Sequence, residues 1–321
     1  MIKLILRRIL IMIPQLFIVS ILVFCLAKAM PGDALTGRAQ NPNADPASIA
    51  EQREKLGLND AVPVQYVRWI KNVAQGDFGK SYTHKLPVTE IVGDRLVNTI
   101  WLGILTLILT YALAIPMGII SGRWNDRWPD KIVTGYNYLT FATPLFIFAL
   151  VVLFLFGFKW DLFPTGGSID PQVESGTFAY FLSKINHMIL PAFSQALIAT
   201  TVTVQYLRNE IIETKFKDFP RTARSKGVPE SKVYSSHILR NSLLPVAAFL
   251  GYEITGVIGG AVFVENIFSY PGIGQLFVSS INLRDYSVVT ALVLMTSLAS
   301  LVGTLLSDMI LSWVDPRIRI E

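Results

Sequence analysis

The 321-residue sequence has little of what disulfide-bonded proteins, metalloproteins and soluble enzymes depend on. It contains one cysteine, Cys25, so no disulfide framework and no cysteine metal site can form within the chain. Of its three histidines, no two have the spacing of metal ligands on one helix face, so we expect neither a metal site nor catalytic residues. Charged residues make up only 16% of the chain, against about 25% in a typical soluble domain.

What the chain has instead is long apolar runs, and apolar residue types make up 52% of it. Each run is close to the ~20 residues that a helix needs to cross a bilayer, and a spanning segment must be helical because lipid cannot satisfy open backbone. The first run is longer than the ~7–15 residues of a signal-peptide core, so we expect an uncleaved helix. The sequence therefore predicts an all-α polytopic membrane protein with six transmembrane helices, at about 9–29, 97–121, 134–158, 188–207, 243–264 and 288–313.

The net charge of +5 comes from basic residues in the segments between these runs, so we do not read it as a nucleic-acid interface. Lysine and arginine gather at the N-terminus, in the 122–133 and 208–242 loops and at the C-terminus. If the chain crosses the membrane six times, these segments all lie on the same side of the membrane. The positive-inside rule identifies that side as the cytoplasm. We therefore expect a multi-pass inner-membrane protein with both termini in the cytoplasm and residues 31–96 and 159–187 outside.

These assignments divide the chain into four parts. They are an N-terminal tip with the first helix (1–30), an extracytoplasmic segment (31–96), a five-helix core containing the 208–242 loop (97–314), and a cytoplasmic tail (315–321).

The extracytoplasmic segment carries two helix signals and one misleading motif. Ser48 and Glu51 have capping-box spacing, and Pro63 suits the first turn of a second helix. So few apolar residues cannot form a core alone, and we expect the segment to pack on the membrane helices. Residues 74–81 (AQGDFGKS) fit a loose phosphate-binding loop, but the buried strand and following helix of that motif are missing, so we predict a surface turn.

The most informative segment is 218–245, DFPRTARSKGVPESKVYSSHILRNSLLP. Pro220 can begin a short helix, and Gly227 can end it in a left-handed turn. Pro229 can begin a second helix that leads into the next span. The pattern predicts a helical elbow that projects from the bilayer, although a basic loop that touches anionic lipid would have a similar composition.

This segment resembles the cytoplasmic loop of bacterial ABC importer permeases, whose signature is Glu-Ala-Ala, then Gly, then Leu-Pro. Here Arg221-Thr222-Ala223, Gly227 and Leu244-Pro245 occupy those places. Arg221 replaces the acidic residue and the gap after Gly227 is longer, and both departures are similar to the dipeptide, oligopeptide and nickel branch. In that branch RTARxKG precedes HxxRNxLLP, which His237, Arg240, Asn241 and Pro245 match.

The resemblance extends over nearly the whole chain. Within the branch, the chain is most similar to the B subunit of oligopeptide permeases. Further matches are Pro31-Gly32-Asp33, Gly76-Asp77-Phe78-Gly79, the run from Glu265 to Gly274, Arg284-Asp285-Tyr286 and Asp315-Pro316-Arg317. These matches are specific to the branch and much less specific to its substrate.

The resemblance implies a type I ABC importer fold and a chain that forms half of a peptide translocation pore. It also implies four kinds of partner: a second homologous permease subunit, two cytoplasmic ATPase subunits, an extracytoplasmic peptide-binding protein, and membrane lipid. ATP and Mg would bind the ATPase subunits, so this chain needs no cofactor of its own. The implied ATPase-coupling residues are Arg221, Thr222, Ala223, Lys226, Gly227, His237, Arg240, Asn241 and Pro245.

An acidic residue in the fifth span is the other candidate for function. Glu253 lies about halfway across, where a charged group is costly unless it faces the bundle interior or a wet cavity. It can line the pore, or it can only order the bundle through a hydrogen bond. Two alternatives to a peptide importer stay open: a stand-alone secondary transporter or channel, and an ABC importer of the same branch for nickel or another small solute.

Overall fold

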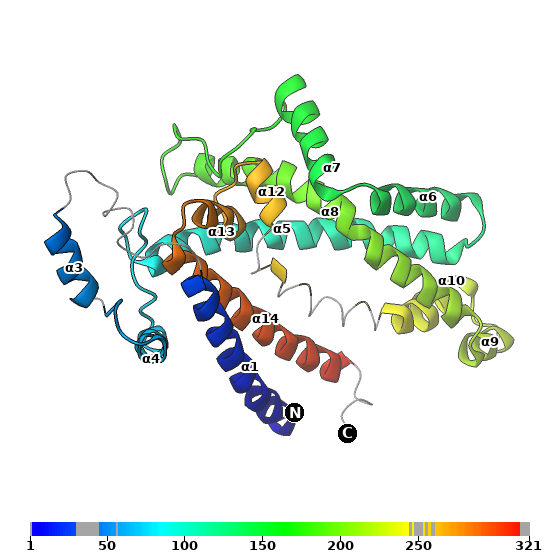
Figure 1. The fold of residues 1–321 in the computed structure, drawn as a ribbon. Coiled ribbons are helices and arrows are strands. Elements are labelled where there is room, and N and C mark those ends of the chain that lie inside the picture. The colour runs from blue at the N-terminus through cyan, green and yellow to red at the C-terminus, as the bar shows by residue number, and fades with distance from the viewer. Residues whose placement is uncertain are drawn as a thin grey trace. The chain divides into compact units, whose positions relative to one another are not determined.

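The computed structural model describes residues 2–29, 45–55, 57–243, 246, 253, 256–257 and 261–314. Within these ranges the protein is all-α, with helices joined by turns (Figure 1). The elements are α1 (Ile2–Ala29), α3 (Pro46–Lys55), α4 (Val62–Ala74), α5 (Val88–Arg123), α6 (Trp128–Ala142), α7 (Leu145–Val152), η1 (Leu153–Lys159), α8 (Phe178–Lys215), α9 (Asp218–Ser225), α10 (Glu230–Lys232), η2 (Val233–Ile238), α12 (Val262–Ile267), α13 (Ile273–Asn282) and α14 (Tyr286–Val314).

Four helices in this part of the chain are long and apolar enough to span a membrane. They lie in α1, α5, α8 and α14, and agree with four of the six expected spans. α5 and α8 run well past the expected limits, because polar turns at their ends continue the helix beyond the apolar stretch. The fifth expected span, 243–264, falls mostly outside the described residues.

The third expected span, 134–158, is not one continuous helix. α6 and the α7–η1 helix pass the length and hydropathy test only as a pair, and they meet at a bend of 101°. Thr143 is extended (φ −96°, ψ 116°), and its N–H still bonds the carbonyl of Thr140. The reason is Pro144, whose ring disfavours helical geometry in the preceding residue and thereby ends α6.

The described chain divides into two compact units, and one of them consists of residues 2–96 with 276–301. In this unit α4 packs on α1, as expected: the ring centroids of Tyr66 and Phe24 are 5.5 Å apart, and Ser20 and Tyr66 share a 2.7 Å hydrogen bond. The capping-box prediction was wrong. Asp45 is the residue that accepts from the amides of Ala47 and Ser48, so the cap lies three residues before Ser48.

The loop that resembles a phosphate-binding motif is a turn, as predicted, and no helix follows Ser81 directly. An isolated bridge between Lys80 and Pro87 closes it. Its serine hydroxyl is buried and donates to the carboxylate of Asp285, which precedes α14.

The other unit consists mainly of residues 97–275 and contains most of the buried core. α5 and α8 approach closely at Gly122, where an added Cβ would lie 2.7 Å from the Cβ of Ile211. Buried Glu265 orders another part: it accepts from the hydroxyl of Thr99 at 2.8 Å and from the amide of Gly274 at 2.6 Å. Because Gly274 lies at the start of α13, this carboxylate caps that helix.

Candidate functional site

The elbow predicted from the sequence is present after α8, and it consists of α9, a turn, α10 and η2 (Figure 1). α9 has eight residues and is about 12 Å long at 1.5 Å per residue. It begins at Asp218, two residues before the expected start at Pro220. Gly227 then adopts φ +78°, as predicted, and α10 begins after Pro229.

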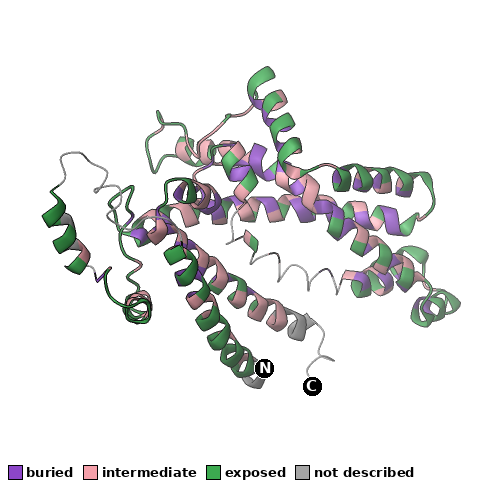
Figure 2. Ribbon diagram, in the orientation of Figure 1, coloured by how far each residue is buried: buried purple, intermediate pink, exposed green. Residues whose placement is uncertain are grey.

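α9 is held to the core by one face only. Pro220 and Ala223 are buried, and Ala223 packs in a cluster with Leu207, Ile211 and Val233. The opposite face is exposed, as Figure 2 shows by its mostly green ribbon. Arg221, Thr222, Lys226 and Gly227 all lie on that exposed side. The short helix therefore offers a basic surface whose angle is set by its buried face.

An ion pair spans the turn between the two helices of the elbow. Arg224 donates to both carboxylate oxygens of Glu230, at 3.0 and 2.9 Å. The hydrogen bonds from the Arg224 guanidinium hold the pKa of Glu230 below its ordinary value. Both side chains are exposed, so the pair adds little stability and mainly orients the turn.

The exit leg of the elbow is wider than an ordinary α-helix. Residues Val233–Ile238 form a π-helix, with Val233 and Ile238 buried against the core, and helical structure continues to residue 243. Short π segments commonly occur at functional positions. His237 is half-buried in this segment, Arg240 and Asn241 are exposed just after it, and Pro245 lies outside the described residues.

An ion pair with a buried carboxylate, near the elbow, was missed from the sequence. Asp130, in the first turn of α6, accepts from Nε and Nη2 of Arg208 on α8, both at 2.7 Å. Ser121 also donates to Asp130, as does the amide of Asp126 at 2.7 Å. The sequence places Asp130 and Arg208 78 residues apart, and Arg208 there looks like one more basic residue of a positive-inside loop.

Two further contacts connect the turn between α5 and α6 to the elbow. Lys215, the last residue of α8, donates to the carbonyls of Gly122 and Arg123 at 2.9 and 3.1 Å. The Arg123 guanidinium lies over the ring of Tyr234 in η2, 5.0 Å from its centroid. Both legs of the elbow therefore contact the same turn.

Glu253 is half-buried, and its Oε2 has no hydrogen-bond partner among the described residues. The phenol of Tyr111 on α5 is the polar group next to it. The Tyr111 hydroxyl is likewise buried without a hydrogen bond of good geometry in the part of the chain that is described. A half-buried carboxyl group and a buried phenol therefore lie next to each other here.

Potential metal ligands do not gather in the described ranges, where no group of three or more His, Cys, Asp or Glu side chains could hold an ion. His187 bonds the carbonyl of Ser183 one turn earlier, at 2.8 Å, which is a local helix contact.

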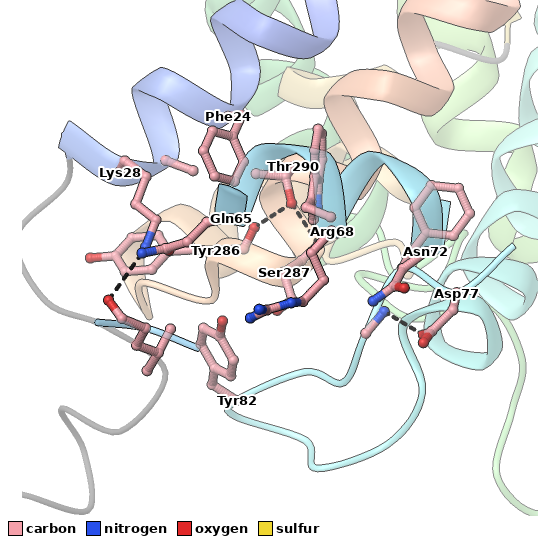
Figure 3. A pocket seen from close by; sticks show the side chains of 15 residues that line it. Phe24, Lys28, Gln65, Arg68, Asn72, Asp77, Tyr82, Tyr286, Ser287 and Thr290 are labelled. Atoms are coloured by element: carbon pink, nitrogen blue, oxygen red, sulfur yellow. Dashed lines mark hydrogen bonds between the residues drawn. The ribbon is translucent and has the colours of Figure 1, made fainter. Parts of the chain in front are cut away.

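A cavity of about 270 Å³ lies in the unit formed by residues 2–96 and 276–301 (Figure 3). Lys28, Arg68 and Asp77 contribute charges of both signs to its lining. Arg68 already pairs with Asp60 at 2.7 Å, and Asp77 accepts from the amide of Gly79 at 2.9 Å. These charges serve the fold of the outer segment, so we assign no ligand to the cavity.

Comparison with known proteins covers nearly the whole chain. The family described as "Binding-protein-dependent transport system inner membrane component" matches residues 114–320, and the corresponding N-terminal family matches residues 1–103. The oligopeptide transport system permease protein AppB of Bacillus subtilis is 39% identical over 316 residues, covering 98% of each chain. Glutathione transport system permease proteins GsiC are similar over 99% of each chain, at 34% identity in Salmonella paratyphi A and 32% in Escherichia coli K12. The chain is therefore a member of the family of inner-membrane components of binding-protein-dependent transport systems.

Proposed function

We propose that this chain forms half of the translocation pore of an ATP-driven importer of short peptides. Its relatives are permeases for oligopeptides and for glutathione, which is itself a tripeptide. The common chemistry of those substrates is a flexible backbone with a free amino group and a carboxylate. The peptide class is therefore better supported than any particular length or side chain.

The observation that carries the coupling role is the elbow itself. α9 has a buried face of Pro220 and Ala223 and an exposed face bearing Arg221, Thr222 and Lys226. A stand-alone secondary transporter has no need of such a projecting helix, whereas a permease driven by separate ATPases needs a rigid element that they can move. We therefore assign the ATPase-coupling surface to the exposed face of α9 and the Gly227 turn.

The remaining parts of the transporter follow from this role. A second homologous permease subunit completes the pore, and an extracytoplasmic protein delivers the peptide. Two cytoplasmic ATPase subunits bind ATP and Mg. Because the ATPase subunits are cytoplasmic, the proposal requires that the elbow and both termini face the cytoplasm.

In this scheme ATP biases an equilibrium between two pore conformations, and the elbow transmits the bias. The Gly227 turn sets the angle at which α9 meets the ATPase. His237, Arg240 and Asn241 belong to the exit leg, and Pro245 follows them in the sequence before Glu253. Glu253 lines the pore and can attract the amino group of a peptide.

Uptake competition in cells tests the substrate class. The gene is deleted and restored, and uptake of a labelled tripeptide is competed with dipeptides, longer peptides, glutathione and Ni²⁺. Competition by peptides but not by Ni²⁺ supports the proposal, and restored Ni²⁺ uptake without peptide uptake would refute the substrate class.

Purification of the intact transporter tests the mechanism. We expect ATPase subunits to co-purify and peptide uptake in proteoliposomes to require ATP hydrolysis. Uptake by this chain alone, driven by an ion gradient, would support the secondary-transporter alternative.

A further inference from the structure

We infer that the turn between α5 and α6 is a brace that holds the elbow at a defined angle, and that Asp130, Arg208 and Lys215 are its positioning residues. This inference rests on the proposed coupling function of α9. It adds a second loop, 122–130, to the machinery that transmits motion between the ATPases and the pore.

The first anchor of the brace is the fork between Asp130 and Arg208. Two nitrogens of one guanidinium meet the two oxygens of one carboxylate, both at 2.7 Å, and Asp130 is buried. A bidentate pair fixes the relative orientation of its two groups as well as their distance. Because Asp130 is on α6 and Arg208 on α8, the fork fixes how the end of α8 lies against the turn.

The second anchor is Lys215, two helical turns beyond Arg208 on the same face of α8. Its ammonium donates to the carbonyls of Gly122 and Arg123 and to Oδ1 of Asn125 at 2.7 Å. These carbonyls are left without partners by the end of α5, so the lysine caps that helix. Two anchors on one helix prevent α8 from pivoting about either of them.

The exit leg is attached to the same turn by a different interaction. The Arg123 guanidinium lies over the ring of Trp124 and over the ring of Tyr234, 4.9 and 5.0 Å from their centroids. Cation–π contacts of this kind tolerate sliding better than a bidentate fork does. The turn therefore contacts both legs of the elbow, the entry leg through hydrogen-bonded charges and the exit leg through a cation–π contact.

The backbone of the turn is held by the same carboxylate. Asp126 has φ +64°, a left-handed conformation that aspartate adopts more readily than most residues, and its amide donates to Asp130 at 2.7 Å. A pair of apolar side chains would often stabilise a helix contact as well as a buried ion pair does, so the fork is better explained by orientation than by stability alone.

The test compares coupling in the complete transporter, reconstituted with its ATPase and binding-protein subunits. Asp130→Asn removes the charge from the fork, and Lys215→Met keeps the aliphatic stem but removes the cap. The matched control is Glu213→Gln, which removes an exposed ion pair of 3.1 Å with Lys217 at the same end of α8. Peptide uptake and ATP hydrolysis are both measured, and their ratio reports coupling.

We expect the number of peptides imported per ATP hydrolysed to fall by about fivefold or more in Asp130→Asn and Lys215→Met, at the low end of typical coupling between sites. Glu213→Gln should keep the wild-type ratio. A purely structural role would lower abundance, uptake and hydrolysis together and leave the ratio unchanged, and that result would overturn the inference.

Two outcomes separate this inference from the coupling proposal. If Gly227→Val uncouples the transporter but the brace variants do not, only the brace inference is wrong. If neither Gly227→Val nor the brace variants uncouple the transporter, both the brace inference and the coupling role of the elbow are wrong. Should Asp130→Asn not accumulate in the membrane, Lys215→Met carries the test. Failure of both to accumulate would mean that these contacts are needed for folding, which also contradicts a positioning role.

Discussion

The hydroxyl of Ser81 donates to the carboxylate of Asp285 over 2.5 Å, across 204 residues of sequence. The same carboxylate accepts from the amides of Tyr82 and Thr83 at 3.1 and 3.2 Å. Asp285 is buried and its two oxygens satisfy three donors of the loop. One acidic side chain thus connects the outer segment to the start of α14.

Asp285→Asn should therefore destabilise this attachment. An amide nitrogen cannot accept a hydrogen bond, so at least one of the three donors loses its partner, at a cost of about 1–3 kcal/mol. We expect a lower thermal midpoint in detergent and faster proteolysis between residues 77 and 87. The matched control is Asp94→Asn, an exposed aspartate of the same unit. Equal stability of the two variants would show that Asp285 is not the anchor.

Gly227→Val should uncouple ATP hydrolysis from transport. Gly227 has φ +78°, which a β-branched residue strongly disfavours, by roughly 1–3 kcal/mol. No atom lies within 4 Å of an added Cβ, so the backbone conformation, not a steric clash, is what changes. The measurement is peptide uptake per ATP hydrolysed at matched abundance.

Gly227→Asn is the control for that experiment, because asparagine tolerates the left-handed conformation and adds a side chain of similar size to valine. We expect Gly227→Asn to keep most of the coupling. If valine and asparagine behave alike, the left-handed turn has no part in coupling.

Cysteine labelling tests the orientation of the chain. Single cysteines replace Ser225, at the end of α9, and Gln172, in the loop before α8, in a Cys25→Ala background; both positions are exposed. Because the positive-inside rule places 208–242 in the cytoplasm, an impermeant thiol reagent on intact cells or spheroplasts should label position 172 and spare 225. The reverse pattern would invert the topology.

Glu253→Gln tests whether the carboxylate of the fifth span acts on the substrate. Glutamine keeps the size of glutamate and one acceptor oxygen, replaces the other oxygen by a donor NH2, and removes the charge. If Glu253 attracts a peptide amino group, uptake of free peptides should fall at least several-fold relative to N-acetylated ones, since one charge–charge attraction at an effective dielectric constant of about 20 is worth up to a few kcal/mol. An unchanged ratio at normal abundance would leave Glu253 with only a structural role. Tyr111→Phe is the companion variant, because that phenol is the polar group beside Glu253.

The sequence by itself determined the features that depend on local composition. The apolar runs in α1, α5, α8 and α14 predict membrane spans, because a run of about twenty predominantly apolar residues is typical of a transmembrane helix. The Gly227 turn and the start of α10 after Pro229 were also predictable, because glycine and proline restrict the backbone at their own positions.

Only the tertiary structure decided which polar groups meet. The fork between Asp130 and Arg208 joins residues 78 positions apart, and Asp285 reaches Ser81 across 204. Neither pair has a periodic or local signature, because a side chain's partner depends on how whole helices pack. The 101° bend at Pro144 could likewise not be predicted from the sequence. A proline there predicts that the helix is interrupted, but the direction and size of the bend depend on the packing of α6 and α7 against α8.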